Sequence, residues 1–180
     1  MGIVVTQAPA APVTLAELKA YLRIAVSDED ALLAGLARGA ADMCEAFTGR
    51  ALIGRAVAEA VAASAAWTRL GAAPVLSIEG VAALGADGEA SPLAAEAFAI
   101  DIDAAGDGWA RVLDAGDAKR VLVSYHAGMA ADPNGLPEAL RHGIVRMAAH
   151  LYTERDRPRG AEPPAAVTAL WRPWRRLRLR

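Results

Sequence analysis

Three groups of side chains in this sequence have types and spacings that are typical of reactive or ligand-binding sites. The first is His142, Arg146 and His150, which recur every four residues and so share one face of a predicted helix. A zinc site would need further ligands, and neither a cysteine nor a glutamate at zinc-protease spacing accompanies the two histidines. The spacing therefore favours a polar stripe that meets solvent or a neighbouring subunit over a metal site.

The second group is Asp101, Asp103 and Asp107, which resembles the start of a calcium-binding loop. An EF-hand needs an oxygen ligand at position 5 and a glutamate at position 12, but Ala105 and Val112 occupy those positions. We interpret the cluster as a solvated strand end followed by a turn. No G-x-S-x-G elbow, G-x-G-x-x-G turn or Walker loop occurs elsewhere. The sequence therefore predicts no catalytic residue, no metal and no cofactor, and a protein that is not an enzyme.

The third group is the C-terminal segment, in which basic residues alternate with aromatic and aliphatic ones. Its members are Trp171, Arg172, Trp174, Arg175, Arg176, Leu177, Arg178, Leu179 and Arg180. Arginine and tryptophan are preferred anchors of protein interfaces, and they also neutralise phosphates and stack on bases. We favour a protein-binding arm; nucleic-acid binding, or folding of the arm on its own domain, remain alternatives. We expect the arm to be disordered alone, so that deleting residues 162–180 leaves the fold intact.

The charge of the chain is divided between its two ends. Residues 1–140 contain 9 basic and 18 acidic side chains, whereas residues 141–180 contain 10 arginines and 3 acids. This division indicates different partners for the body and the arm. No uncharged apolar stretch is long enough to span a membrane, and no signal peptide precedes Lys19, the first charged residue. The sequence therefore predicts a protein that is made and kept in the cytoplasm.

Three helices are predicted, at residues 14–23, 28–48 and 137–155. Thr14 with Glu17, and Ser27 with Asp30, have the spacing of capping boxes, and Gly49 is expected to end the second helix. The third helix begins at Pro137. One of its faces carries a row of apolar residues, the predicted packing seam, at successive spacings of 4, 3 and 4 residues: Leu140, Ile144, Met147 and Leu151.

Short apolar runs separated by glycines predict a strand-rich insertion at residues 51–128. The candidate strands are 52–61, 75–84, 97–102, 110–113 and 120–126, and Asp87-Gly88 predicts a type I′ hairpin turn. The alanine-rich stretch near Ala60 is equally compatible with a helix. The expected layout is a flexible leader over 1–13, a connector domain over 14–160 and a basic arm over 161–180. The predicted class is α+β: a small helical bundle with a β-rich insertion and an extended C-terminal arm.

Several segments resemble the head-to-tail connector (adaptor, or head-completion) proteins of long-tailed phages and gene transfer agents. The similar segments are residues 13–23 (VTLAELKAYLR), 28–33 (DEDALL), 47–53 (FTGRALI), 136–141 (LPEALR) and 150–155 (HLYTER). The more specific parts are Thr48-Gly49-Arg50 after the second helix and the final helix that starts at a proline and ends in Tyr-x-x-Arg. The resemblance covers about 80 residues near the two ends.

The resemblance implies a structural virion protein of the neck, assembled in the bacterial cytoplasm. Such a protein forms a homo-oligomeric ring of twelve below the portal protein and docks a tail-side stopper, connector or tail terminator. Its ring extends the DNA channel, through which DNA passes without specific binding, and no membrane is involved. The portal-binding arm would then be residues 171–180. The alternative is a small nucleic-acid-binding module that acts through the same arm, although the predicted folded body is acidic.

Overall fold

The chain forms two compact units, and the predicted α+β class is confirmed. The computed structural model describes residues 2–5, 10–154 and 163–176. The helical unit comprises Ala10–Ile53 and Ala130–Arg180, and the strand unit comprises Met1–Pro9 and Gly54–Met129. These units differ from the predicted leader, connector domain and arm, because residues 2–5 form a strand and residues 163–176 belong to the helical unit.

The first helix, α1 (Leu15–Leu22), begins at the predicted capping box. The Thr14 hydroxyl accepts a hydrogen bond from the Glu17 N–H at 3.1 Å, and the Glu17 carboxylate accepts one from the Thr14 N–H at 2.6 Å. This backbone hydrogen bond lowers the pKa of Glu17. A lowered pKa means that the stabilisation is present at neutral pH and is lost as the pH falls through it.

The second helix, α2 (Asp30–Thr48), starts later than predicted and ends where predicted. The Ser27–Asp30 capping box is wrong: Glu29 is the N-cap without a side-chain hydrogen bond, and the Asp30 N–H donates to the Ser27 backbone carbonyl. The local turn therefore satisfies this N–H without the serine hydroxyl. At the other end Gly49 adopts a φ of +67° and closes the helix, as predicted.

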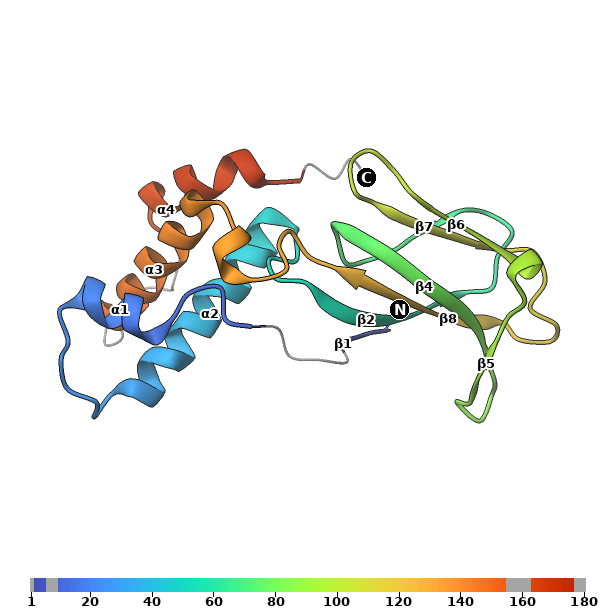
Figure 1. Cartoon of the computed structure of the whole chain (residues 1–180), viewed down its shortest axis with the longest axis horizontal. Coiled ribbons are helices and arrows are strands. Elements are labelled where there is room, and N and C mark those ends of the chain that lie inside the picture. Colours follow the sequence, from blue (N-terminus) through green and yellow to red (C-terminus); the bar gives the residue numbers. More distant parts are fainter. Residues whose placement is uncertain (1, 6–9, 155–162, 177–180) are drawn as a thin grey trace. The chain divides into compact units, whose positions relative to one another are not determined.

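The third helix, α3 (Glu138–Thr153), is the centre of the helical unit and contacts α1, α2 and α4 (Figure 1). Of the predicted seam, Leu140, Ile144 and Met147 are fully buried, and Leu151 is half-buried. Arg141 forms an ion pair with Glu17, which ties α3 to α1. In the described part of the chain, no helix is long and apolar enough to cross a membrane.

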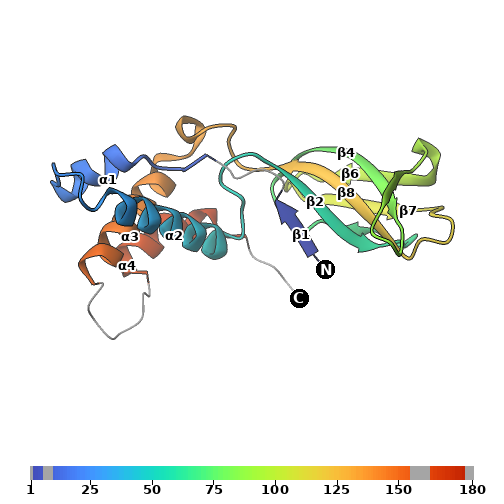
Figure 2. The same cartoon turned by 90° about the horizontal axis from the view of Figure 1, so that it is seen from below.

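The strand unit contains two antiparallel sheets. The five-stranded sheet has the order β1-β2-β8-β4-β5, and the three-stranded sheet has the order β3-β7-β6. Figure 2 shows β2, β8 and β4 side by side. The bounds are β1 (Gly2–Val5), β2 (Arg55–Ala62), β3 (Thr68–Arg69), β4 (Val75–Leu84), β5 (Ala90–Pro92), β6 (Phe98–Ile102), β7 (Gly108–Val112) and β8 (Arg120–Ala127).

All five predicted strands are present, and three short or terminal strands were missed. β1 lies in the segment that was predicted to be a flexible leader, and β3 has only two residues. β5 contains Pro92, and a proline in the sequence makes a strand an unfavourable prediction. The predicted hairpin joins β4 to β5, but its turn is longer than type I′. The Gly85 N–H donates to the Glu89 carbonyl at 2.8 Å, and Gly88 alone in this turn has a positive φ.

A buried polar cluster lies in the core of the strand unit, where β2 and β8 pair. Glu59 is fully buried, and its Oε2 accepts hydrogen bonds from the Tyr125 hydroxyl and the Gly71 N–H, both at 2.8 Å. The same hydroxyl accepts one from the Ala72 N–H at 3.1 Å. Burial raises the pKa of Tyr125, so this hydroxyl keeps its proton and remains a donor to Glu59. The cluster thus anchors residues 71 and 72 to the sheet.

Replacing Tyr125 by phenylalanine is expected to lower the free energy of unfolding by about 1–3 kcal/mol, because buried hydrogen-bonding groups then lose their partner. Urea denaturation of the full chain measures this change. Tyr152→Phe is the matched control, because its hydroxyl bonds Glu29 at a half-exposed position and should matter less. A Tyr125→Phe chain as stable as the wild type would contradict the assignment.

Candidate functional site

The predicted arm is partly folded onto the helical unit. Residues 165–171 form α4 (Ala165–Trp171), and a single 3-10 turn, η3 (Arg172–Trp174), follows it. Proline at 164 suits the start of a helix because its missing N–H is not needed there. The expectation that this part of the arm is extended and disordered alone is therefore wrong. Leu177, Arg178, Leu179 and Arg180 lie outside the described residues.

Trp171 belongs to the core of the helical unit. Its side chain is fully buried, and its ring lies 5.8 Å from the Phe47 ring of α2, measured between centroids. Its indole fills the space above Gly143 of α3, where an added Cβ would lie 2.2 Å from the indole Nε1. Trp171 was predicted to anchor the arm on a partner, but no surface of it is accessible in this conformation, so it stabilises the helical unit instead.

Two hydrogen bonds fix the chain after α4 against the end of α2. The Arg50 side chain donates from Nε to the Trp174 carbonyl at 2.9 Å, and the Arg176 N–H donates to the Thr48 carbonyl at 2.8 Å. The Arg175 guanidinium lies 5.6 Å from the centroid of the Phe47 ring. Backbone and side-chain contacts therefore hold residues 174–176 in one conformation.

This packing leaves a compact cationic surface at the C-terminal end of α2, which we call the arginine surface. It consists of Arg172 and Arg175, which are exposed, and Trp174 and Arg176, which are half-buried. Positive side chains at this end of a helix also interact favourably with the helix dipole. A preformed surface with arginine and a partly exposed tryptophan is suited to an acidic protein partner.

The other predicted groups do not form a reactive site. On α3, His142 is exposed and its ring meets Tyr21 edge-on at 6.4 Å, whereas His150 is half-buried. In the strand unit, Asp103 accepts hydrogen bonds from Asp107 N–H and Trp109 Nε1, and so braces a turn. Among the described residues, no three histidine, cysteine, aspartate or glutamate side chains are placed to hold a metal ion.

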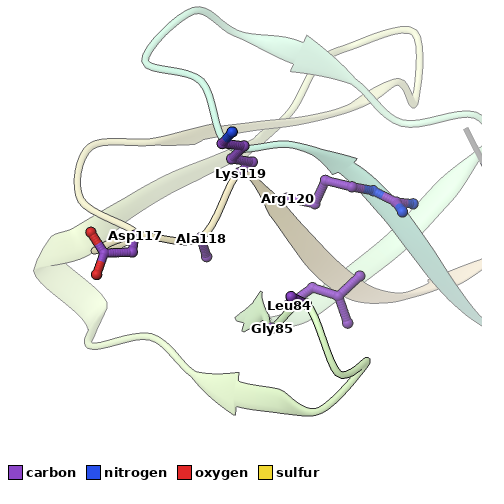
Figure 3. A pocket seen from close by; sticks show the side chains of 7 residues that line it. Leu84, Gly85, Asp117, Ala118, Lys119 and Arg120 are labelled. Carbon is purple, nitrogen blue, oxygen red and sulfur yellow. The ribbon is translucent and has the colours of Figure 1, made fainter.

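The sequence did not indicate an open hollow of about 590 Å³ at one end of the strand unit (Figure 3). Its lining residues are Leu84, Gly85, Ala86, Asp117, Ala118, Lys119 and Arg120. Figure 3 shows the Asp117, Lys119 and Arg120 side chains pointing in different directions rather than toward one point. All three are exposed, so the hollow lacks the convergent, shielded polar groups of an active site.

No protein-family model matches this chain, and no curated protein sequence matches it. Solved structures do match along nearly the whole length. A chain from the neck of an empty gene transfer agent (GTA) particle, computed with C6 symmetry, is 27% identical with a TM-score of 0.79. Chains from the virion of a native GTA particle and from a native GTA neck computed with C12 symmetry are 28% identical, with TM-scores of 0.78 and 0.77. Each comparison covers 99% of this chain and 97% of the other, which confirms the resemblance to the connector family.

Proposed function

We propose that this chain is a structural protein of the neck of a phage-like particle of the gene transfer agent kind. The single observation that carries the proposal is the similarity over 99% of this chain to a GTA neck protein, with a TM-score of 0.79. Both units take part in that match, so the resemblance extends beyond a common helical bundle. The role is structural: the chain is a virion protein, and its assembly into the particle takes place in the bacterial cytoplasm.

Within the neck, identical copies form a ring of twelve between the portal protein and a tail-side stopper, connector or tail terminator. The symmetries of the similar necks, C6 and C12, support a cyclic arrangement. In a ring each copy meets the next through two different surfaces, so one side of α2 faces a different surface on the neighbour. Leu32 and Arg38 lie on the exposed side of α2 and are available for such a contact.

The arginine surface binds the portal protein. Arg172 and Arg175 are exposed. Arg50 holds the Trp174 carbonyl and the Phe47 ring of α2 contacts the Arg175 guanidinium, so little conformational entropy is lost on binding. The strand unit contributes exposed carboxylates at Asp101, Asp114 and Asp117, which repel phosphates. We place these acidic residues beside the DNA channel, where DNA passes without specific binding.

The experiment that tests this function has two parts. The chain should be found in the necks of purified particles by mass spectrometry and cryo-electron microscopy, and its absence from them would refute the proposal. At micromolar concentration the free protein should sediment as a monomer or a weak oligomer and should form a ring only when portal is added. A stable ring without portal would contradict the second expectation alone.

A further inference from the structure

An exposed tryptophan and an arginine lie together on the outer face of the three-stranded sheet. On β7, Ala110 and Val112 are buried, so Arg111 between them points away from the core. The chain before β3 runs alongside, because the Val112 N–H donates to the Ser64 carbonyl at 2.8 Å. The Arg111 guanidinium lies 4.8 Å from the centroid of the Trp67 ring, which is 44% exposed. We call this pair the Trp67–Arg111 surface.

The other polar side chains of this sheet face have partners within the strand unit, whereas Arg111 lacks a carboxylate. Arg69 of β3 forms an ion pair with Asp107 at 2.9 Å, and the Trp109 indole donates to Asp103 at 3.0 Å. Among the described residues, Arg111 forms no ion pair, and its Nε is buried without an acceptor. Its cation is therefore held by the indole and is left without an anion.

These two side chains define the chemistry of a partner. Exposed tryptophan and arginine are the preferred anchors of protein interfaces, and the N–H groups of a guanidinium suit a carboxylate. A matching segment must supply one carboxylate beside a stretch of backbone without a large side chain, so that the indole ring can be covered.

The turn between β4 and β5 of this chain has both features. Asp87, Gly88 and Glu89 are all exposed. The Asp87 carboxylate accepts a hydrogen bond from the Glu89 N–H at 3.0 Å and so braces the turn. The Glu89 side chain forms no ion pair within the described part of the chain. A Cβ added at Gly88 would meet no atom within 4 Å, so the tip of the turn is open.

The turn and the Trp67–Arg111 surface belong to different sides of the strand unit. Figure 1 shows the turn projecting from one side of this unit and β7 along the opposite side. The turn is therefore directed away from the Trp67–Arg111 surface of its own chain. A ring needs two such different surfaces on each copy.

We propose that the β4–β5 turn of one copy docks on the Trp67–Arg111 surface of the neighbouring copy. Glu89 pairs with Arg111, and the backbone at Gly88 covers the Trp67 ring. The inference rests on the proposed ring and adds a contact between strand units to the contact of α2. One ion pair and one aromatic contact bury little surface, so free copies associate weakly and the contact forms when the portal gathers them.

Cross-linking in assembled particles tests which copy supplies the turn. Ala66→Cys and Ala86→Cys place thiols at exposed positions beside the two surfaces and leave the contact residues unchanged. The native Cys44 is fully buried, and burial raises the pKa of its thiol to about 12, so it stays unreactive. With a short bis-maleimide, particles that contain a mixture of the two variants should yield linked pairs. Particles with either variant alone should not.

A chain that carries both new cysteines should cross-link into a ladder of oligomers that ends at the full ring. Cross-links within single chains only, or no cross-links, would overturn the proposal. Cross-links from position 66 to another neck protein instead of a second copy would also overturn it, as would protection of this position by DNA alone. Absence of the wild-type chain from the particles would instead refute the proposed function.

A charge exchange provides the second test. Arg111→Glu and Glu89→Arg should each reduce the number of copies per particle by about tenfold, and the two changes combined in one chain should restore it. Arg120→Glu and Glu96→Arg are the matched controls, because they make the same changes at other exposed sites of the strand unit. Glu89 lies on an exposed turn, so its variant keeps the fold even if Arg111→Glu does not. Equal loss in the controls, or no rescue by the double variant, would contradict the contact.

Discussion

Trp171→Ala is expected to lower the free energy of unfolding of the helical unit by about 3–5 kcal/mol, the range for truncating a large buried aromatic side chain. The indole is fully buried between Phe47 of α2 and Gly143 of α3. Its removal leaves a cavity and uncouples α4 from the bundle. A loss of this size is a large fraction of the stability of a small domain, so the helical unit should unfold at a clearly lower temperature and urea concentration than in the wild type.

Thermal and urea denaturation, followed by circular dichroism at 222 nm, measure this loss because the helices are in the affected unit. Trp174→Ala is the matched control: the same residue type three positions later is half-buried, and it should cost no more than about 1–2 kcal/mol. Equal effects of the two substitutions would contradict the assignment of Trp171 to the core.

Gly143→Ala tests the same contact from the opposite side. The added Cβ would lie 2.2 Å from the Trp171 indole, so the helices must move apart or the ring must turn, at an expected cost of about 1–3 kcal/mol. Gly39→Ala is its control, since an added Cβ there meets no atom within 4 Å and alanine favours the helix. A Gly143→Ala chain with unchanged stability would show that the packing is looser than described.

Truncation follows the same reasoning. Removing residues 162–180 takes away Val167 and Trp171, both buried, so the shortened chain should lose the helical unit. This outcome replaces the expectation from sequence that the arm is dispensable for folding. Attachment experiments therefore require point substitutions on the arginine surface rather than deletion.

The helices and main strands could be predicted because their signals are local. Capping residues, a terminal glycine and apolar positions at helical spacing lie within one element, so they can be recognised in the sequence without knowledge of the fold. The ends of α2 illustrate the limit. Gly49 ends the helix through its own backbone conformation. The Asp30 N–H, which the Ser27 hydroxyl was expected to bind, is instead satisfied by the Ser27 backbone carbonyl in a turn whose geometry depends on the surrounding chain.

The role of the C-terminal segment could not be predicted from its composition. Arginine and tryptophan are typical of both interfaces and cores, and only the fold places Trp171 against Gly143, 28 residues earlier in the sequence. A signal was nevertheless present. Pro164, followed by Val167 and Trp171 four residues apart, has the pattern of a short amphipathic helix with one buried face.

Glu59 was missed for a similar reason. It alternates with Val57 and Val61, which places it on the inner face of β2, but its partner Tyr125 lies 66 residues further along the chain. A pattern within one strand shows which side chains point inward. It does not show which distant group satisfies a buried carboxyl.

The largest functional effect is expected from reversing charge on the arginine surface. Arg172→Glu combined with Arg175→Glu replaces two exposed cations by two anions, and should weaken binding to the isolated portal ring roughly 10- to 100-fold. Added salt should also weaken the wild-type interaction, because exposed charges are screened. Arg176 is left unchanged, since its side chain is half-buried.

The fold should tolerate this double substitution. Arg172 is exposed, and loss of the Arg175 interaction with the Phe47 ring is expected to cost about 0.5–1 kcal/mol. Lys119→Glu combined with Arg120→Glu is the matched control, because it makes the same net charge change on the strand unit. Equal loss of portal binding in the control would indicate a general effect of net charge rather than a defined surface.

Measuring duplex DNA affinity with the same variants separates the portal-binding role from the nucleic-acid alternative. If the arginine surface binds an acidic portal, the double variant loses portal binding while its weak DNA affinity changes little. If the surface grips packaged DNA, each arginine–phosphate contact releases counterions, and the double variant loses affinity and salt dependence together. Burial of Trp171 argues against the second outcome, because it removes one of the two indoles that base stacking would need. Loss of DNA binding with portal attachment intact would assign the surface to nucleic acid.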